Sequence, residues 1–526
     1  MSLSPILAIC GTTGVGKSKL AIELAVALSN TFQNNSSYPW RGARVINADA
    51  MQVYAGLDVL TNKVPVEEQK GVEHLLMGFK QPGEQYVVGQ WVRDAREAIE
   101  ETHRRKQLPI VVGGTSYWIQ HLVFPGRLAS SSDNVDPEQH EKQHASPSTS
   151  ISDRLAQAIK ATPPELVEIY EHLPSDPPRA STEPEAAYSL HSLLACLDPP
   201  VASRWHWKDT RKVLRSLEII RQNGRLSSEI IQEQSQSISE PRYRSLFLWL
   251  YAKPEILNPR LDERVDEMMK RGLLQEVDDL VGIEEIAANS KTPVSDTLDF
   301  TLGIYQSIGY REFSQYLTED ITTDDVDKRY ADTVGRMKTS TRQYAKRQVR
   351  WLRNTLLPVV NAANSTSRVT ENSPVVPAYL LDATDLSTWD VNVQQLAERI
   401  TRDFLEQKEL PDPLSLSDVA REMLSIPDKS TNPADKLNAR RKRICPTCTV
   451  DSTRPVMIEE GKEWRAHVGT KVHRRLATRS QRRPEDWRER AAAAAQEKES
   501  HSAVREEGSS SESDVDTSLL LLETKQ

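Results

Sequence analysis

A glycine-rich loop near the start of the chain constrains its fold more than any other feature. The run Gly11-Thr12-Thr13-Gly14-Val15-Gly16-Lys17-Ser18 fits the pattern G-x-x-x-x-G-K-[ST]. An apolar run, Ile6 to Cys10, precedes it, and leucines at helical spacing follow it. This context indicates a P-loop, whose backbone N–H groups bind phosphate oxygens at a helix N-terminus. The motif predicts a diphosphate or triphosphate ligand, with Lys17 as a point charge and Ser18 as a Mg²⁺ ligand, and leaves the reaction open.

The first 125 residues alternate between strand-like and helical patterns. The strand candidates are Ile6–Cys10, Arg44–Ala48 and Pro109–Val112. Helical segments follow the first and the third, and another at Val88–Arg104 precedes the third. Such alternation is typical of an α/β fold with a parallel sheet flanked by helices. We therefore expect a P-loop NTPase-like sheet, together with a helical insertion domain and a small C-terminal metal-binding module.

Shifts in composition divide the chain into further parts. Serine-rich stretches, proline pairs and a Cys/His cluster mark the changes. The expected order is a first core part at 1–125, a mainly helical insertion at 126–205 with a disordered stretch near 129–150, a second core part with basic helices at 206–405, a linker at 406–439, a Cys/His module at 440–478 and a disordered tail at 479–526.

Charge and cysteine content limit the possible compartments and partners of the protein. The net charge is −8, but basic residues concentrate locally, so nucleic acid stays a possible partner. Four cysteines in 526 residues make no disulfide framework, which indicates a reducing compartment. The chain lacks an apolar run of about 18 residues, so we expect no membrane span. We expect a monomer in the cytoplasm, with the nucleus and the mitochondrion as further destinations.

The acidic residue expected of a nucleotide-hydrolysing P-loop protein does not follow the strand Pro109–Val112, which runs into Gly113-Gly114-Thr115 instead. Asp49 follows the second strand. Because the carboxyl ends of parallel strands meet at one ligand crevice, Asp49 should face the P-loop. A carboxylate beside a diphosphate suits proton abstraction from a nucleophile. A helix-capping role for Asp49 is the alternative that the spacing leaves open.

Several blocks in order resemble the tRNA dimethylallyltransferases, also called tRNA isopentenyltransferases. They cover residues 1–355, and the Cys/His module is similar to that of the longer eukaryotic members. The blocks are the P-loop Gly11–Ser18, Asp49-Ala50-Met51-Gln52-Val53-Tyr54 with Gly56 and Asp58, Val112-Gly113-Gly114-Thr115, Leu197-Asp198-Pro199, His206-Trp207-Lys208-Asp209, Ile308-Gly309-Tyr310-Arg311, and the run from Thr341 to Leu352.

The resemblance implies transfer of a dimethylallyl group from dimethylallyl diphosphate to the exocyclic amine of adenosine 37 in tRNA, next to the anticodon. The P-loop then holds a diphosphate leaving group, with Mg²⁺ at Ser18. Asp49 is the expected base, and Thr13 matches a family threonine that contacts the bridging oxygen. Of the two arginines Arg260 and Arg264, the resemblance favours Arg264 as the one that reaches the diphosphate.

The family's tRNA contacts carry over to a larger set of positions. Cations at three- and four-residue spacing in the later helix share one face, where they can meet phosphate; a solvated helix surface is the alternative. The expected tRNA-binding residues are Asp49, Ala50, Met51, Gln52, Thr115, Arg154, Arg211, Lys212, Arg215, Gly309, Tyr310, Arg311, Arg342, Lys346 and Arg347. Departures occur at Thr12, where proline is usual, and at His206-Trp207-Lys208-Asp209, where His-Pro-Asn-Asp is usual.

A Cys/His cluster predicts a zinc site near the C-terminus. Cys445 and Cys448 form C-x₂-C, and His467 and His473 form H-x₅-H after 18 intervening residues. Two thiolates and two imidazoles suit tetrahedral Zn²⁺. The wide spacing resembles RNA-associated fingers of the U1 and matrin type, and the flanking basic runs favour contact with tRNA over a nuclear-targeting signal.

Two other functions stay open from the sequence. A nucleotide or small-molecule kinase shares the P-loop and predicts ATP as the donor. The Gly113-Gly114-Thr115 strand end and the later basic helix argue against it. A non-catalytic RNA-binding adaptor would keep the fold and the finger, and Asp49 would then be dispensable.

Overall fold

The computed structural model describes residues 3–35, 38–125, 151–236, 240–289, 302–318, 326–367, 374–427, 439 and 441–482. The chain divides into two compact units. The first combines Met1–Leu128 with Ser239–Thr431, and the second combines Ala129–Ile238 with Asn432–Lys525. The predicted stretch near 129–150 and the tail beyond 482 lie outside the described residues. Within the described residues, no helix combines the length and the hydrophobicity needed to cross a bilayer.

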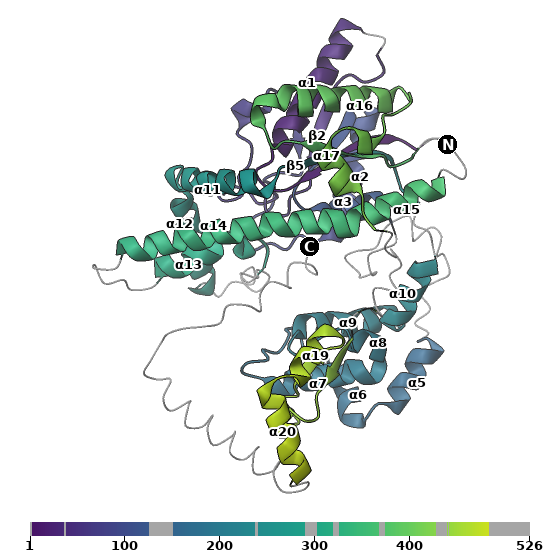
Figure 1. Ribbon diagram of the computed structural model, residues 1–526, viewed down its shortest axis with the longest axis vertical. Helices are drawn as coiled ribbons and strands as arrows, with labels where there is room; N and C mark the ends of the chain where they lie inside the picture. Colours follow the sequence, from purple (N-terminus) through teal and green to yellow (C-terminus); the bar gives the residue numbers. More distant parts are fainter. Residues whose placement is uncertain are drawn as a thin grey trace. The chain divides into compact units, whose positions relative to one another are not determined.

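A six-stranded parallel sheet forms the centre of the first unit. The strand order is β3-β2-β4-β1-β5-β6, which confirms the expected α/β fold with a parallel sheet (Figure 1). The strands are β1 (Pro5–Gly11), β2 (Ala43–Asn47), β3 (His74–Leu75), β4 (Leu108–Val112), β5 (Arg244–Tyr251) and β6 (Ala378–Asp382).

Both faces of the sheet are buried. Along β1, Leu7 and Ile9 pack into one core and Ile6, Ala8 and Cys10 into the other, as the two-residue period of a strand requires. The first core lies beneath α1 (Lys17–Asn34) and α16 (Leu396–Leu405), which Figure 1 shows side by side.

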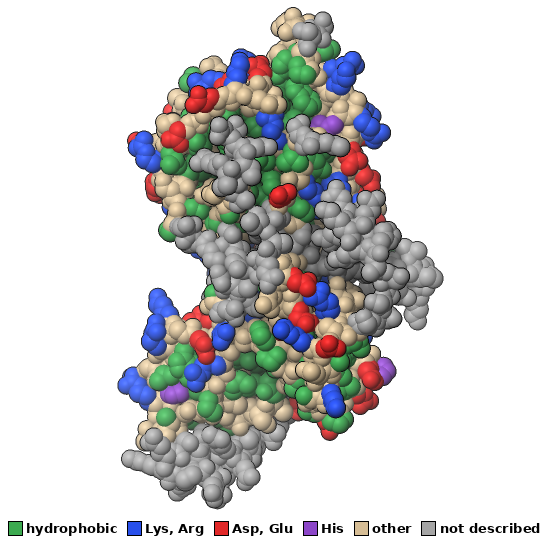
Figure 2. Space-filling model, turned by 90° about the vertical axis from the view of Figure 1, so that its right-hand side faces the viewer, with side chains coloured by type: hydrophobic (Ala, Val, Ile, Leu, Met, Phe, Trp, Pro, Cys, Tyr) green, Lys and Arg blue, Asp and Glu red, His purple; other side chains and the backbone are tan. Residues whose placement is uncertain are grey.

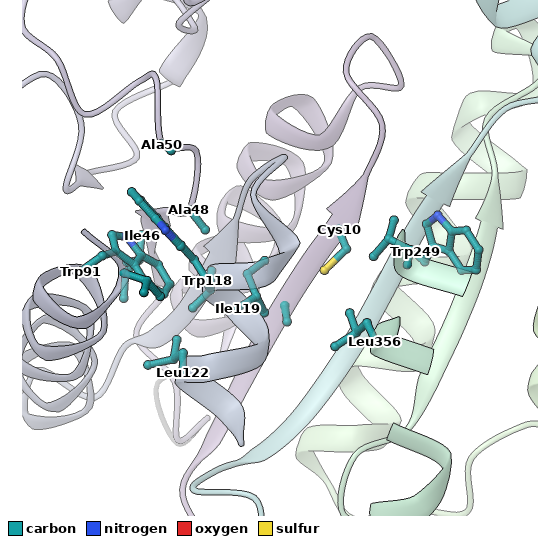
Figure 3. Packing of buried hydrophobic residues seen from close by; sticks show 14 of the residues in the cluster. Cys10, Ile46, Ala48, Ala50, Trp91, Trp118, Ile119, Leu122, Trp249 and Leu356 are labelled. Carbon is teal, nitrogen blue, oxygen red and sulfur yellow. The ribbon is translucent and has the colours of Figure 1, made fainter. Parts of the chain in front are cut away.

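The opposite core lies beneath α2 (Val88–Arg104), α3 (Ser116–Val123) and α15 (Leu357–Ser367). Trp91 of α2 stacks on Trp118 of α3 with ring centroids 5.1 Å apart. Figure 3 labels both rings in the buried core. The Trp91 indole N–H also donates to the carbonyl oxygen of Asn47, at 2.8 Å. This bond fixes the end of β2, two residues before Asp49.

Long helices complete the first unit. They are α11 (Pro254–Lys270), α12 (Leu273–Asn289), α13 (Tyr310–Thr318) and α14 (Val326–Trp351). Helix α14 leads through a short π-helical segment, Leu352–Leu356, into α15. Figure 1 shows α14 and α15 almost in line.

The predicted linker at 406–439 is wrong over its first half. Helix α17 (Asp418–Leu424) buries Ala420, Met423 and Leu424 against the sheet core. The Tyr379 hydroxyl donates to the carbonyl oxygen of Pro411, at 2.7 Å. Proline and serine content suggested a linker, but a few apolar side chains at helical spacing are enough to dock this segment.

The second unit holds the helical insertion and the finger. Its helices are α5 (Asp153–Ala161), α6 (Pro164–Glu171), α7 (Pro184–Leu197), α8 (Pro199–Ala202), α9 (Thr210–Asn223) and α10 (Ser227–Gln236). The predicted boundary at residue 205 is wrong, because Val213, Leu217 and Ile220 of α9 pack against the leucines of α7. The insertion therefore continues to about residue 238. The finger consists of β7 (Lys442–Ile444), antiparallel to β8 (Met457–Glu459), followed by α19 (Lys462–Val468) and α20 (Lys471–Arg482).

Candidate active site

The strand register brings three loops to one edge of the sheet. Val112 of β4 lies opposite both Ile9 of β1 and Asn47 of β2. The loops that follow these strands carry the P-loop, Asp49 and Gly113-Gly114-Thr115. These three segments therefore lie together at the carboxyl edge of the sheet, as expected.

The P-loop connects β1 to α1 with little room for side chains. Gly16 has φ 89°, and a Cβ there would lie 2.6 Å from the ring of Trp389. Lys17 Nζ donates to the carbonyl oxygen of Thr12 at 2.7 Å, so the lysine curls over its own loop. Ser18 is part-exposed in the first turn of α1. The loop thus offers a cation and a hydroxyl at a helix N-terminus, as phosphate binding requires.

Lys17 and Arg264 form a charged centre in the electrostatic sense, because Asp49 acts on the charge of both. The pKa of Lys17 is lowered to about 8, chiefly by desolvation; Asp49 opposes the change and Arg264 adds to it. Desolvation likewise lowers the pKa of Arg264 to about 10, again against the pull of Asp49. Two partly desolvated cations that act with the same carboxylate are suited to bind an anion such as diphosphate.

The second arginine considered from the sequence, Arg260, is used differently. Its guanidinium donates to the carbonyl oxygens of Ala383, at 2.9 Å, and Thr384. These bonds hold α11 to the end of β6. Arg264 is therefore the residue of this pair that lies at the charged centre.

Asp49 caps a turn with one carboxylate oxygen and leaves the other free of that bond. Its Oδ1 accepts the Met51 N–H at 3.0 Å, as a turn-capping residue does. Its own N–H donates to Asn47 Oδ1 at 3.0 Å. Its Oδ2 lies 3.1 Å from the point where a Cβ on Gly114 would stand. One carboxylate oxygen thus fixes the turn, and the other lies over the glycine at the end of β4.

Thr115 holds the segment that contains Asp49. It is 3% exposed, its Oγ1 accepts the Ala50 N–H at 3.0 Å, and its N–H donates to the Ala48 carbonyl oxygen at 3.1 Å. Gln52 is likewise engaged, since its Nε2 donates to the carbonyl oxygens of Thr61 and Asn62. Met51 is part-exposed beside them.

Two residues of α14 that the sequence did not single out reach the same place. Gln348 Oε1 accepts the Thr13 N–H at 2.9 Å, and its Nε2 donates to the Gly114 carbonyl oxygen at 3.1 Å. Burial and the nearby Asp49 raise the pKa of Tyr344, so its hydroxyl keeps its proton. Their four-residue spacing on a helix that also carries cations was the available signal.

The predicted tRNA-binding residues of the first unit have mixed surroundings. Arg342 pairs with Asp262, Lys346 is exposed, and the Arg347 guanidinium lies 5.8 Å from the Tyr344 ring centroid. Desolvation and the charge of Arg311 lower the pKa of Arg347, against the influence of Tyr344.

The turn before α13 serves packing. A Cβ on Gly309 would lie 2.6 Å from Leu60. The Tyr310 hydroxyl donates to Glu284 Oε2 at 2.6 Å. Arg311 is thereby held at the start of α13, with an exposed side chain.

The remaining predicted tRNA-binding residues lie in the second unit. Arg154 of α5 is 4.0 Å from Glu229 with a largely exposed side chain. Helix α9 carries Arg211, Lys212, whose ammonium lies 5.0 Å from the Trp205 ring centroid, and Arg215, which bonds Glu218 at 3.1 Å. On the face drawn in Figure 2, several Lys and Arg side chains gather along one side of this unit, which shows how an acidic chain can carry a local basic surface.

The finger brings together all four predicted metal ligands. Sγ of Cys445 and Sγ of Cys448 lie 3.5 and 3.4 Å from His473 Nδ1. His467 Nε2 lies 3.3 Å from the same nitrogen, and all four ligand atoms fall within 4.8 Å of one another. Two sulfur and two nitrogen donors at this separation fit a tetrahedral Zn²⁺ site. The Arg443 guanidinium lies 4.0 Å from the Trp464 ring centroid, and the Trp464 ring lies 5.9 Å from the ring of His467.

Known proteins resemble this chain over most of its length. The sequence model of the family described as IPP transferase matches residues 52–355. The tRNA dimethylallyltransferase of Saccharomyces cerevisiae is 35% identical over 486 residues, which cover 92% of this chain and 95% of that protein. The Homo sapiens tRNA dimethylallyltransferase is 29% identical, covering 89% and 85%. A solved structure of a eukaryotic dimethylallyltransferase acting on tRNA superposes with a TM-score of 0.65 at 32% identity, covering 92% and 98%.

The likeness to the yeast protein and to the solved structure covers 92% of the chain. It confirms the family predicted from the ordered motifs and the enzyme class, a prenyl transferase that modifies tRNA, in preference to a kinase or an adaptor. The chain belongs to the IPP transferase family, together with the tRNA dimethylallyltransferases of yeast and human.

Proposed function

We propose that this protein transfers the dimethylallyl group of dimethylallyl diphosphate to the exocyclic amine of adenosine 37 in tRNA, giving N6-dimethylallyladenosine. The observation that carries the proposal is the register of β1, β2 and β4, which brings the P-loop with Lys17 and the turn with Asp49 to one edge of the sheet. Asp49 and Arg264 both influence the pKa of Lys17 there. Two cations beside one carboxylate suit a reaction in which an anion leaves and a proton is removed.

The reaction breaks the C–O bond between the allylic carbon and the diphosphate, and it forms a C–N bond to adenine. The diphosphate leaves with the electron pair of the broken bond. Lys17 and Arg264 would stabilise the negative charge that grows on it, and Thr13 would contact its bridging oxygen. The proton of the amine would pass to Asp49 Oδ2, the oxygen that does not cap the turn.

We expect a divalent cation to bind together with the diphosphate. Ser18, part-exposed at the start of α1, would hold Mg²⁺ together with diphosphate oxygens. Bound there, the ion would supply positive charge to the leaving group.

The adenine must leave its stack before it can reach Asp49. The exposed Lys346 and the cations Arg347 and Arg311 would hold the phosphates of the anticodon loop next to the site. The cations of α5 and α9 would contact the same tRNA, and the finger, holding Zn²⁺ on Cys445, Cys448, His467 and His473, would add its basic surface. We place this activity in the cytoplasm, the nucleus and the mitochondrion, and we propose a monomeric enzyme.

The direct test is nucleoside analysis of tRNA after incubation with the purified protein and each candidate donor. With dimethylallyl diphosphate and Mg²⁺, digestion and mass spectrometry should yield N6-dimethylallyladenosine from tRNA that carries adenosine 37, and none from tRNA with guanosine there. ADP release from ATP with a small acceptor would support the kinase instead. Binding of tRNA without any product from either donor would support the adaptor.

A further inference from the structure

The side chain of Gln348 joins two loops that are distant in the sequence. Its carboxamide oxygen accepts the N–H of Thr13, at 2.9 Å, and its carboxamide nitrogen donates to the carbonyl oxygen of Gly114, at 3.1 Å. One planar group therefore bonds the P-loop on one side and the end of β4 on the other. Gln348 is 7% exposed.

The side chains around Gly114 are closely packed. A Cβ on Gly114 would lie 2.7 Å from Gln348 Nε2, 3.1 Å from Asp49 Oδ2 and 3.7 Å from the Tyr344 hydroxyl. Three side chains from two elements thus converge over one glycine. Gln348 bonds the P-loop at Thr13 and the backbone at Gly114, over which the Asp49 carboxylate lies, and so sets the separation between the P-loop and the proposed base.

The chemistry of the carboxamide suits both partners at once. A backbone N–H needs an acceptor and a carbonyl needs a donor, and glutamine supplies one of each from a single group. A carboxylate at this position would face the Gly114 carbonyl oxygen without a proton and would add negative charge beside Asp49. A leucine would leave two buried backbone groups without partners.

The bond between Gln348 and Thr13 also indicates a role for α14. The helix presents cations at Lys346 and Arg347, and the next residue is the one that bonds Thr13. A helix that meets the acceptor's phosphates is therefore bonded directly to the loop that holds the donor's diphosphate.

We propose that Gln348 is a positioning residue of this transferase. It fixes the P-loop at Thr13 relative to the strand end at Gly114, and so places the dimethylallyl donor correctly relative to the base. It touches neither the reacting carbon nor the amine. Displacement by about 1 Å in an active site can reduce turnover about 100-fold, which is the size of effect expected here. This inference rests on the proposed function for its kinetic part alone.

The test compares Gln348→Leu and Gln348→Glu with Gln343→Leu, a control at an exposed glutamine of the same helix. For both Gln348 variants we expect kcat for dimethylallyl transfer to fall about 100-fold. The KM for tRNA should stay within about threefold of the wild type, because the phosphate-binding cations remain. The control should match the wild type in both constants.

A second measurement does not depend on turnover. Hydrogen–deuterium exchange of the peptide containing Thr13 should become faster in Gln348→Leu and stay unchanged in Gln343→Leu, while peptides from β1 keep their protection. Wild-type kcat in Gln348→Leu, or unchanged exchange at Thr13, would overturn the proposal. A wild-type protein without transferase activity would overturn the proposed function, and the exchange experiment would still decide whether Gln348 holds the loop.

Discussion

The indole N–H of Trp207 donates a 2.8 Å hydrogen bond to the carbonyl oxygen of Pro455, and so attaches the finger to the helical insertion. Trp207 is 2% exposed and packs with Ala187 and Met457. Lys442 adds two bonds: its backbone N–H donates to the carbonyl oxygen of Ser203, and its ammonium donates to the carbonyl oxygen of Arg204. The position that departs from the family pattern His-Pro-Asn-Asp is thus a docking point for the finger.

Replacement of Trp207 by phenylalanine should loosen the finger. The change keeps a ring but removes the donor, and leaving the buried Pro455 carbonyl unpaired costs about 1–3 kcal/mol. Hydrogen exchange of peptides from 441–482 under mild urea should become faster. Trp40→Phe, the same change in the first unit, is the control and should leave those peptides unaffected. Equal exchange in both variants would argue against docking through Trp207.

Replacement of Asp49 by alanine should abolish transfer while tRNA binding persists. Loss of a general base lowers kcat by about 10²- to 10⁴-fold, and the cations that would bind the phosphates are untouched. Single-turnover assays and filter binding separate the two effects. Asp418→Ala removes a carboxylate whose side chain is 97% exposed and should behave as wild type. Full turnover by Asp49→Ala would exclude Asp49 as the base.

The affinity for dimethylallyl diphosphate should fall as the pH rises through about 8. The pKa of Lys17 is lowered to about 8 by desolvation, so the ammonium is largely protonated at pH 7 and largely neutral at pH 9. Since the charged form binds the anion, Kd should rise about tenfold across this interval, following the charged fraction. Calorimetric titration measures it. Lys17→Met should lose this pH dependence, whereas the exposed Lys19→Met should retain it; a pH-independent wild type would contradict the assignment.

Arg264 and Arg260 should differ in what their loss affects. Arg264→Ala removes a cation from the diphosphate centre, and we expect kcat to fall about 10²- to 10³-fold with little change in melting temperature. Arg260→Ala leaves the Ala383 and Thr384 carbonyls without their donor, at a cost of about 1–3 kcal/mol in stability. Steady-state kinetics and thermal melts distinguish these effects. The reverse pattern would assign the diphosphate to Arg260.

Metal analysis should find about one equivalent of zinc per chain, as a single tetrahedral site requires. Cys445→Ser combined with Cys448→Ser should lose it, because two of the four donors disappear. Cys196→Ser, a change at an exposed cysteine in the insertion, should keep the metal. Zinc content unaffected by the double change would refute the site.

Much of the first unit follows from local sequence patterns. A glycine-rich loop between an apolar run and leucines at helical spacing defines β1, the P-loop and α1. A parallel sheet places the ends of its strands together, so Asp49 and Gly113-Gly114-Thr115 could be assigned to one edge before any coordinates. The zinc ligands were equally predictable, because C-x₂-C and H-x₅-H need only a local turn and a short helix to meet.

Domain boundaries were harder to predict from the sequence, because they depend on which surface the apolar stripe of a helix packs against. Helix α9 has such a stripe, and no local signal distinguishes packing on the leucines of α7 from packing on the sheet. Helix α17 was likewise hidden by proline and serine around it.

By itself, the sequence of this protein determined the phosphate-binding loop, the first strands of a parallel sheet, the family and the chemical types present at the site. Only the tertiary structure decided which side chains meet. Gln348 lies 335 residues from Thr13 and bonds its N–H, and Trp207 lies 248 residues from Pro455 and bonds its carbonyl oxygen. Such contacts have no local period or spacing, because they arise when separate elements pack, and each partner is set by burial rather than by its neighbours in the chain.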